Sequence, residues 1–326
     1  RGKVFIQAES EVAAINMVFG ASAAGARAMT SSSSPGISLK QEGISYLSGA
    51  RLPAVIVNVM RAGPGLGNIW PAQSDYFQAT KGGGHGDYHL IVLAPSTVQE
   101  CYDFMFNSFD LADYYLTPVM ILSDGLLGQM MEPVLVQSSD FRFQISEARV
   151  QSKDLRIRNY KLITKTWALT GCSGRKPNLV KSFYMVEGDL EKFNLILQEK
   201  YREIIAKEQC FEEVFLEGAR VIIIAYGSMA RIAKGAVKRL RRAGKKVGMI
   251  RLITLWPFPE KAFIGRLKKN TRYLVVEMSC GQMVEDERLA INGKCPVDFL
   301  GRSGGGIPSE EDIIKAVTSL EKNSKS

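Results

Sequence analysis

The sequence predicts an α/β protein in two parts, a doubly wound domain followed by a smaller α/β domain, and three observations lead to this expectation. The 326 residues are enough for two cores of ordinary size, since domains usually hold about 100–200 residues. Short apolar runs alternate along the chain with longer segments of helical periodicity. The apolar runs show no apolar/polar alternation, which is typical of parallel strands covered on both faces.

The first part, residues 1–133, contains the elements of a doubly wound domain. We expect strands at Val4–Gln7, Arg27–Thr30, Ala54–Met60, Leu90–Leu93 and Val119–Ser123. We expect helices between them at Glu11–Ala23, Ile37–Leu47 and Thr97–Ala112. The chain starts at Arg1 and enters a strand-like run almost at once, so we interpret it as N-terminally truncated.

Residues 134–218 are expected to form a connecting arm, because the apolar pattern loosens there and charges are frequent. One helix is predicted within the arm, near Leu190–Lys207. Residues 219–326 then resume the α/β alternation as a smaller second domain. Its expected strands are Val221–Tyr226, Val247–Leu252 and Tyr273–Glu277, and its expected helices are Met229–Ala243, Glu260–Lys268 and Glu310–Leu320.

The apolar runs and the cysteines of the sequence bear on the cellular compartment of the protein. The longest apolar runs, Ala54–Met60 and Val221–Tyr226, are far shorter than the roughly 20 residues that cross a bilayer. No signal peptide is recognisable, so we expect a cytoplasmic protein without membrane association. The cysteines contain no C-x-x-C pair, so neither a zinc site nor an iron–sulfur cluster is expected on this chain. They are Cys101, Cys172, Cys210, Cys280 and Cys295.

The chain carries a basic excess, with 42 Lys and Arg against 33 Asp and Glu. The densest basic segment, residues 238–246, ends a predicted helix, where cations oppose the negative pole of the helix dipole. A solvated helix end is one interpretation, and docking of an acidic electron carrier such as ferredoxin is the other. No aromatic residues interleave these cations, so a nucleic-acid surface is not expected.

Polar residues follow several of the predicted strands. In open parallel sheets, ligands bind beyond the carboxyl ends of the strands. The residues in such positions are Glu9 and Glu11, the serine-rich segment Ser31–Gly36, Arg61 with the turn Gly63–Gly67, and Asp124. We expect Glu11, the serine segment and Arg61 to converge on one edge.

Each of these features also has a purely structural interpretation. Glu11 could cap its helix or complement the helix dipole. The serine segment could be turn chemistry, and Arg61 could be half of a structural ion pair. Residue pattern alone therefore leaves the reaction open.

Other sites are poorly supported by the pattern. The turn Gly63–Gly67 is not G-x-G-x-x-G, and no phosphate-loop motif occurs. His85 and His89 are the only histidines, and a loop followed by a strand does not present them as a helix would, so a metal site there is a minor alternative. No Ser/His/Asp or Cys/His pairing stands out.

The chain resembles the α subunit of 2-oxoacid:ferredoxin oxidoreductases. The resemblance is carried by A-E-S-E-V-A-A-I-N-M-V (residues 8–18), P-G-I-S-L-K-Q-E-G-I-S-Y-L (35–47), V-N-V-M-R-A-G-P-G-L-G (57–67), K-G-G-G-H-G-D-Y (81–88) and D-G-L-L-G-Q-M-M-E-P (124–133). It continues in L-Q-E-K-Y (197–201), A-Y-G-S-M-A-R (225–231), I-T-L-W-P-F-P (253–259) and V-E-M-S-C-G-Q-M (276–283), so it covers nearly the whole chain.

The resemblance implies a thiamine-diphosphate-binding domain of the pyrimidine type, followed by a domain like the C-terminal domain of transketolase. It also implies a β subunit that holds the diphosphate and Mg²⁺, with iron–sulfur clusters on γ/δ-type subunits. Coenzyme A would be the co-substrate and ferredoxin the electron acceptor. This chain would then supply half of an active site in a hetero-oligomer.

Two residues carry over from the family. Glu11 matches the glutamate that binds the aminopyrimidine ring and activates the cofactor, and Arg61 matches the arginine that receives the substrate carboxylate. The family's upstream G-Y-P-I-T-P-S type segment, whose threonine helps bind substrate, is absent here. The loop Lys81–Tyr88 could shape the pocket or the coenzyme A path, or could be a structural glycine loop.

The strings around Glu11 and at residues 81–88 look most like the branched-chain type, which acts on 2-oxoisovalerate. The 2-oxoglutarate type shares much of the same framework and remains an alternative. A different thiamine enzyme, or a non-catalytic scaffold subunit, are alternatives from other classes.

Overall fold

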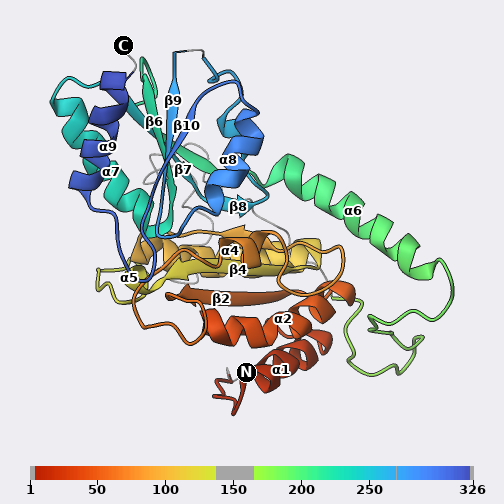
Figure 1. Ribbon diagram of the computed structural model, residues 1–326. Coiled ribbons are helices and arrows are strands. Elements are labelled where there is room, and N and C mark those ends of the chain that lie inside the picture. The colour runs from red at the N-terminus through yellow and green to blue at the C-terminus, as the bar shows by residue number, and fades with distance from the viewer. Residues whose placement is uncertain (1–3, 137–164, 269, 324–326) are drawn as a thin grey trace.

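The computed structural model describes residues 4–136, 165–268 and 270–323. Within these residues the chain forms two five-stranded sheets, each with helices on both faces (Figure 1). The α/β fold class expected from the sequence is confirmed. In the described part of the chain, no helix combines the length and apolarity that a bilayer crossing requires.

The first sheet has the strand order β1-β2-β4-β3-β8. Its parallel strands are β1 (Met29–Ser33), β2 (Ala54–Met60), β3 (Ile91–Leu93) and β4 (Pro118–Asp124). The edge strand β8 (Thr254–Trp256) comes from far along the chain and pairs antiparallel with β3. The helices of this part are α1 (Glu11–Ala23), α2 (Ser34–Gly49), α3 (Tyr76–Thr80), α4 (Val98–Tyr115) and α5 (Gly125–Gly128).

Both faces of the first sheet are apolar, which explains the absence of polar alternation in its strands. In β4, Met120 packs into the core under α2, and its neighbour Val119 packs into the core under α4 and α6 (Asp189–Lys207). Helix α1 packs on α2, and α6 projects outward from the body (Figure 1).

The second sheet has the order β10-β9-β6-β7-β5. Strands β6 (Val221–Tyr226), β7 (Val247–Leu252), β9 (Arg272–Glu277) and β10 (Val297–Gly301) are parallel, and β5 (Phe211–Val214) is antiparallel to β7. Helices α7 (Gly227–Arg242) and α9 (Glu310–Asn323) pack on one face, and α8 (Met283–Ile291) on the other. One apolar core joins the α8 face to the α2 face of the first sheet.

Several sequence expectations need correction. The strand expected at Val4–Gln7 does not form, because no neighbouring strand pairs with these exposed residues in the described chain. The serine segment is not a loop, since Ser33 ends β1 and Ser34 begins α2. The helix expected at Glu260–Lys268 is only a single 3-10 turn, Glu260–Ala262, and Gly265 beyond it has a positive φ of 74°.

Candidate active site

The junction between β1 and α2 lies between the two residues that the sequence singled out. A Cβ placed on Gly36 would lie 2.0 Å from Ser32 Oγ and 2.7 Å from Glu11 Oε1, so only glycine lets these groups approach. On the other side, Ser33 and Ser34 contact Arg61. The structure therefore brings Glu11, the serine segment and Arg61 to one place, as expected for the carboxyl edge of a parallel sheet.

Glu11 is the first residue of α1, but it is not the residue that caps it. The hydroxyl of Ser10 accepts the hydrogen bond from the Ala13 amide, at 3.2 Å. The half-buried Glu11 carboxylate accepts no hydrogen bond from any residue that the structure describes. It lies instead over Gly36 in the first turn of α2, where the helix dipole favours negative charge.

A buried lysine supports this junction. Lys40 on α2 is 1% exposed, and its ammonium donates to Thr30 Oγ1 at 2.8 Å and to the Ser31 carbonyl at 3.0 Å. Burial lowers the pKa of Lys40, and the Glu11 carboxylate raises it in part. The Lys40 ammonium and the Glu11 carboxylate therefore attract each other at this junction. Sequence reasoning missed Lys40; a lysine on an otherwise buried helix face was the available signal.

Arg61 follows β2 and is held on several sides. Its Nη1 donates to the carbonyls of Leu66 at 2.6 Å and Asn68 at 3.1 Å, and its Nε donates to Ser33 Oγ at 3.3 Å. The Ser34 hydroxyl fixes the Arg61 main chain, lying 3.1 Å from both its amide nitrogen and its carbonyl oxygen.

The guanidinium of Arg61 therefore has one nitrogen left for a ligand. In the described part of the chain Arg61 forms no ion pair, and its Nη2 donates to no protein acceptor. The interpretation of Arg61 as half of a structural ion pair is therefore wrong within the described part of the chain. A ligand carboxylate would meet Nη2 first, and a fork with Nε would require Ser33 to give up its weak hydrogen bond.

The glycine turn after Arg61 has a geometric purpose. A Cβ on Gly67, whose φ is +61°, would lie 1.8 Å from the Ala62 carbonyl oxygen. Gly67 thus lets the loop curl back, with the Asn68 amide donating to Ala62 at 3.0 Å and the Ala62 amide donating to Trp70 at 2.9 Å. This curl places two loop carbonyls against Arg61.

Asp124 ends β4, in register with Met60 of β2, and has a structural role. Its carboxylate caps α5, accepting from the amides of Leu126 at 3.0 Å and Leu127 at 3.1 Å. It also accepts from the Ser228 hydroxyl at 2.7 Å, which joins β4 to the start of α7. Burial raises the pKa of Asp124, and these hydrogen bonds lower it in part.

The two histidines do not form a metal site. His89 stacks on Trp256 with ring centroids 4.5 Å apart and meets the Tyr201 ring edge-on at 5.3 Å. His85 meets Tyr46 edge-on at 6.3 Å. Among the described residues, no group of three or more His, Cys, Asp or Glu side chains is placed to hold a metal ion.

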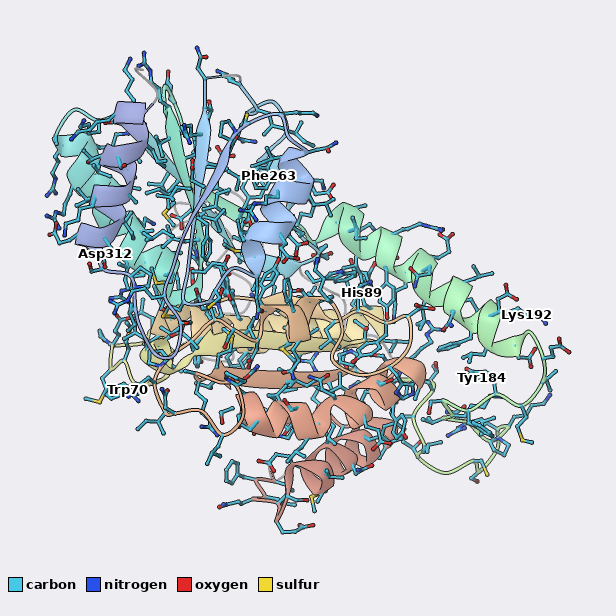
Figure 2. All side chains as sticks on the ribbon, viewed as in Figure 1. Trp70, His89, Tyr184, Lys192, Phe263 and Asp312 are labelled. Carbon is cyan, nitrogen blue, oxygen red and sulfur yellow. The ribbon has the colours of Figure 1, made fainter. Side chains whose placement is uncertain are left out.

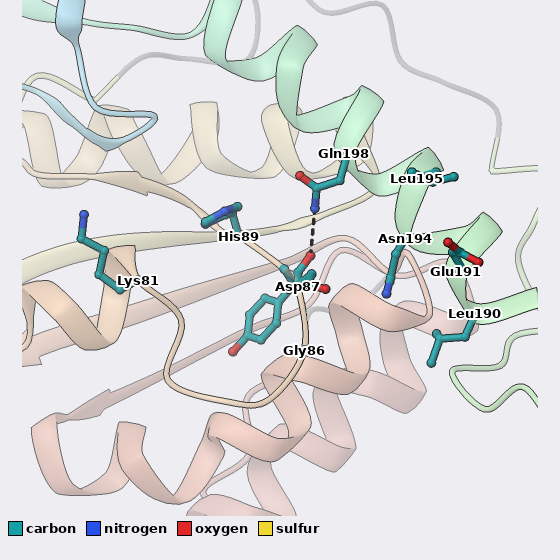
Figure 3. Close-up of a pocket in the computed structure, with 10 residues that line it drawn as sticks. Lys81, Gly86, Asp87, His89, Leu190, Glu191, Asn194, Leu195 and Gln198 are labelled. Carbon is teal, nitrogen blue, oxygen red and sulfur yellow. Dashed lines mark hydrogen bonds between the residues drawn. The ribbon is translucent and has the colours of Figure 1, made fainter. Parts of the chain in front are cut away.

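A pocket of about 640 Å³ separates the loop Lys81–Tyr88 from α6. Asp87 and Glu191 line it together with Lys81, and Gln198 donates to the Asp87 carbonyl at 3.3 Å (Figure 3). The Lys81 ammonium is already paired with Asp286. The remaining charges are carboxylates, which do not favour the phosphates of coenzyme A.

The basic segment at the end of α7 is partly paired within the chain. Arg239 bridges to Glu310 and Glu311, and Lys245 pairs with Glu321 at 2.6 Å. These contacts favour its interpretation as a solvated helix end over a docking surface for ferredoxin.

Comparisons with known proteins extend these observations. Residues 1–172 match the family described as "Pyruvate flavodoxin/ferredoxin oxidoreductase, thiamine diP-bdg". Residues 219–313 match "Pyruvate:ferredoxin oxidoreductase core domain II". The chain is 47% identical to the ketoisovalerate oxidoreductase subunit VorB of Methanothermobacter marburgensis, over 98% of this chain and 85% of the relative. It is 33% identical to the 2-oxoglutarate synthase subunit KorA of Methanothermobacter thermautotrophicus, over 98% and 88%.

Two solved structures have a similar fold. The 2-oxoglutarate:ferredoxin oxidoreductase from Magnetococcus marinus, solved with 2-oxoglutarate, coenzyme A and succinyl-CoA bound, gives a TM-score of 0.75 at 26% identity. The match covers 96% of this chain and 56% of that one, so this chain spans little more than half of its length. A split-gene transketolase gives a TM-score of 0.55 at 14% identity, over 95% and 81% of the two chains, which is a likeness of fold alone.

Proposed function

We propose that this chain is the α-type subunit of a 2-oxoisovalerate:ferredoxin oxidoreductase. The proposal starts from the finding that the chain belongs to the pyruvate flavodoxin/ferredoxin oxidoreductase family and is a subunit of an oxidoreductase acting on 2-oxoacids. The reaction would convert the branched-chain 2-oxoacid, with coenzyme A, into CO₂ and acyl-CoA and reduce ferredoxin. The choice of 2-oxoisovalerate is supported by the identity of 47% to a ketoisovalerate subunit, against 33% and 38% to two 2-oxoglutarate synthase subunits.

One observation carries the proposal at the level of the site. A carboxylate without a protein hydrogen-bond partner, that of Glu11, and a guanidinium nitrogen without a protein acceptor, Nη2 of Arg61, flank the same junction in the described chain. A half-buried acceptor and an open donor at one junction are features expected of a site that binds a polar ligand.

Glu11 fits the pyrimidine half of thiamine diphosphate. When bound, this cofactor supplies the electron sink that decarboxylation of a 2-oxoacid needs. Glu11 would hold a proton at the pyrimidine ring nitrogen, because its carboxylate is free, half-buried and next to the buried Lys40 cation. Arg61 would bind the substrate carboxylate through Nη2 and orient the adjacent ketone.

The remaining groups belong, in this proposal, to partner subunits in the cytoplasm. Glu11 and Arg61 supply no ligand set for a diphosphate or Mg²⁺, so a β subunit would hold both. The five cysteines form no disulfide in the described chain and are widely spread in the sequence, so γ/δ-type subunits would carry the iron–sulfur clusters that lead to ferredoxin. Thiols kept in the reduced state are typical of the cytoplasm.

The test is the activity of the complex purified with its natural partners. We expect coenzyme A-dependent reduction of ferredoxin or viologen, with a higher kcat/KM for 2-oxoisovalerate than for 2-oxoglutarate. A preference for 2-oxoglutarate would favour the alternative substrate. Reduction of lipoamide instead would indicate another thiamine enzyme, and a complex that turns over without this chain would make it a scaffold.

The same complex tests Arg61. Arg61→Ala should lower kcat/KM through a higher KM for the 2-oxoacid and leave cofactor binding unchanged. The loss in transition-state stabilisation should equal that of one charge-assisted hydrogen bond, about 1.5–3 kcal/mol. Lys176 is exposed and lies outside the junction, so Lys176→Ala is a control that should leave both parameters unchanged. An unchanged kcat/KM in Arg61→Ala would remove Arg61 from the substrate site.

A further inference from the structure

The loop that holds Arg61 is itself held by the second half of the molecule. The side-chain amide of Asn68 donates to the carbonyl of Gly304 at 3.1 Å, and its oxygen accepts from the Trp70 amide at 2.9 Å. The main-chain carbonyl of Asn68 accepts from Arg61 Nη1. Asn68 thus connects the arginine, its own loop and the glycine-rich segment after β10.

A close packing contact reinforces this connection. Gly305 has φ +93°, and a Cβ at this position would lie 2.5 Å from Trp70 Cβ and 3.1 Å from Trp70 Cγ. The backbone of Gly305 therefore fits directly against the side chain of Trp70, which is labelled in Figure 2. Trp70 in turn closes the loop through the hydrogen bond from the Ala62 amide.

The hydrogen bonds show that the loop orients Arg61. Both hydrogens of Arg61 Nη1 go to loop carbonyls, so the position of residues 66–68 sets the orientation of the whole planar guanidinium. Leu66 and Ile69 have side chains that are 81% and 73% exposed, so packing of those side chains does not fix the loop. Besides the hydrogen bonds within the loop, the contacts with Gly304 and Gly305 hold it in place.

We propose that Asn68 is a positioning residue for substrate binding, through which the glycine segment of residues 301–306 orients Arg61. The inference rests on the proposed role of Arg61 as the group that receives the substrate carboxylate. It assigns the second half of the chain a part in substrate affinity that does not require contact with the substrate.

Two variants test the connection between the Asn68 loop and the glycine segment, one from each side. Asn68→Asp keeps the oxygen that accepts from Trp70 and loses the donation to Gly304. Gly305→Ala leaves the loop sequence intact and pushes Trp70 away. In the assembled oxidoreductase, each should raise the KM for the 2-oxoacid about three- to tenfold, the worth of one hydrogen bond, with kcat within about twofold of wild type.

Matched controls separate this effect from local damage. Ile69→Ala changes an exposed side chain between the two key residues of the loop. Gly293→Ala imposes a similar backbone strain, at φ +70°, where an added Cβ would meet nothing within 4 Å. Both should leave KM unchanged.

A second measurement does not depend on turnover. Hydrogen–deuterium exchange of the Ala62 and Asn68 amides, which are bonded within the loop, should accelerate in Asn68→Asp and Gly305→Ala. Unchanged exchange in both variants would overturn the connection, even in an assembly without activity.

The outcomes also distinguish this inference from the function on which it rests. If Arg61→Ala raises KM but Asn68→Asp and Gly305→Ala do not, the positioning role is wrong and the substrate role of Arg61 stands. If Arg61→Ala leaves KM unchanged, both fail together.

Discussion

At the scale of single residues, the start of α1 shows two tasks divided between neighbours. Ser10 satisfies the helix amides, so Glu11 keeps its carboxylate free although it occupies a position where acidic residues often act as caps. Lys40 then supplies a buried positive charge beneath the junction. This division makes Glu11 a residue whose substitution should affect chemistry more than stability.

Glu11→Gln should therefore cost little stability and most of the cofactor activation. Loss of the favourable dipole interaction is worth about 0.3–1 kcal/mol, whereas loss of acid–base participation should slow exchange of the thiamine C2 proton about 10²–10⁴-fold in the assembled complex. Deuterium exchange followed by NMR measures this rate. The exposed neighbour Glu9 supplies the control Glu9→Gln. A rate for Glu11→Gln within a few-fold of wild type would exclude Glu11 from the mechanism.

A second carboxyl behaves differently. Glu287 on α8 is fully buried, and neither of its side-chain oxygens has a hydrogen-bond partner in the described structure. Burial raises its pKa well above the ordinary value, and the nearby carboxylates of Glu277 and Asp286 raise it further. Tyr76, another neighbour, donates its hydroxyl hydrogen bond to Asp286 and not to Glu287.

This raised pKa predicts the sign of a pH effect. The folded chain binds a proton at Glu287 that the unfolded chain releases near pH 4.3, so the stability from Glu287 is fully present below about pH 4.3 and is lost as the pH rises. Glu287→Gln should therefore unfold at higher urea than wild type at neutral pH, with the advantage shrinking toward pH 4. Glu285→Gln, on the exposed face of the same helix, should show no such trend. Parallel pH profiles for wild type and Glu287→Gln would contradict the assignment.

At the scale of elements, an ion pair between β7 and α4 locks the two sheets together. Arg251 binds Glu100 through both terminal nitrogens, one at 2.8 Å, and the two side chains are only 6% and 18% exposed. The amide of Ser96 adds a hydrogen bond to Glu100 at 2.7 Å. Removing one partner of a buried pair leaves the other charge uncompensated.

Arg251→Met should thus lower the free energy of unfolding by about 3–5 kcal/mol, because the Glu100 carboxylate stays buried without its partner. Adding Glu100→Gln should restore much of the loss. The exposed pair Arg202–Glu199 on α6 offers the comparison, and Arg202→Met should cost less than about 1 kcal/mol. Chemical denaturation of the four chains measures these differences, and equal losses in Arg251→Met and Arg202→Met would contradict the argument.

The same scale shows what the sequence could predict. The helix Glu11–Ala23 and the strands Ala54–Met60 and Val247–Leu252 are confirmed to the residue, because long apolar runs and a clear serine boundary define them. Strands β5, β8 and β10 were missed, since each has at most five residues, and β5 and β8 also depend on a partner strand distant in sequence.

The candidate site follows the same logic. Glu11 and Arg61 could be named from strand ends and from the family resemblance, and the structure places them around one junction. The hydrogen bonds from Asn68 to Gly304 and from Lys40 to Thr30 could not be predicted from the sequence, because they depend on which atoms face each other after folding. Asp124 was correctly found at a strand end, but its partner Ser228 is distant in sequence and reveals a structural role.

At the scale of the whole molecule, the two sheets are joined by hydrogen bonds and by a shared apolar core. The side chain of Gln73, from the first half, donates to the Tyr226 carbonyl at 3.0 Å and accepts from the Met278 amide at 3.1 Å. A single apolar core includes residues from both halves, such as Ile56 of β2 and Ile224 of β6.

We expect one cooperative thermal transition, because unfolding either sheet alone would expose the shared core. Calorimetry on the isolated chain should give a calorimetric enthalpy equal to the van't Hoff enthalpy, with far-UV and near-UV circular dichroism changing together. Two separate transitions would mean that the halves unfold independently in spite of their shared strand and core.

The late strand β8 also matters for how the protein is made. Leu93 of β3 pairs with Thr254, so the ribosome must synthesise most of the remaining chain before the first sheet has its last strand. At about 5–20 residues per second, the apolar edge of β3 stays open for on the order of ten seconds. An unpaired apolar edge is a template for association with other chains. Every nascent copy therefore passes through an interval in which the native contacts do not yet cover this edge.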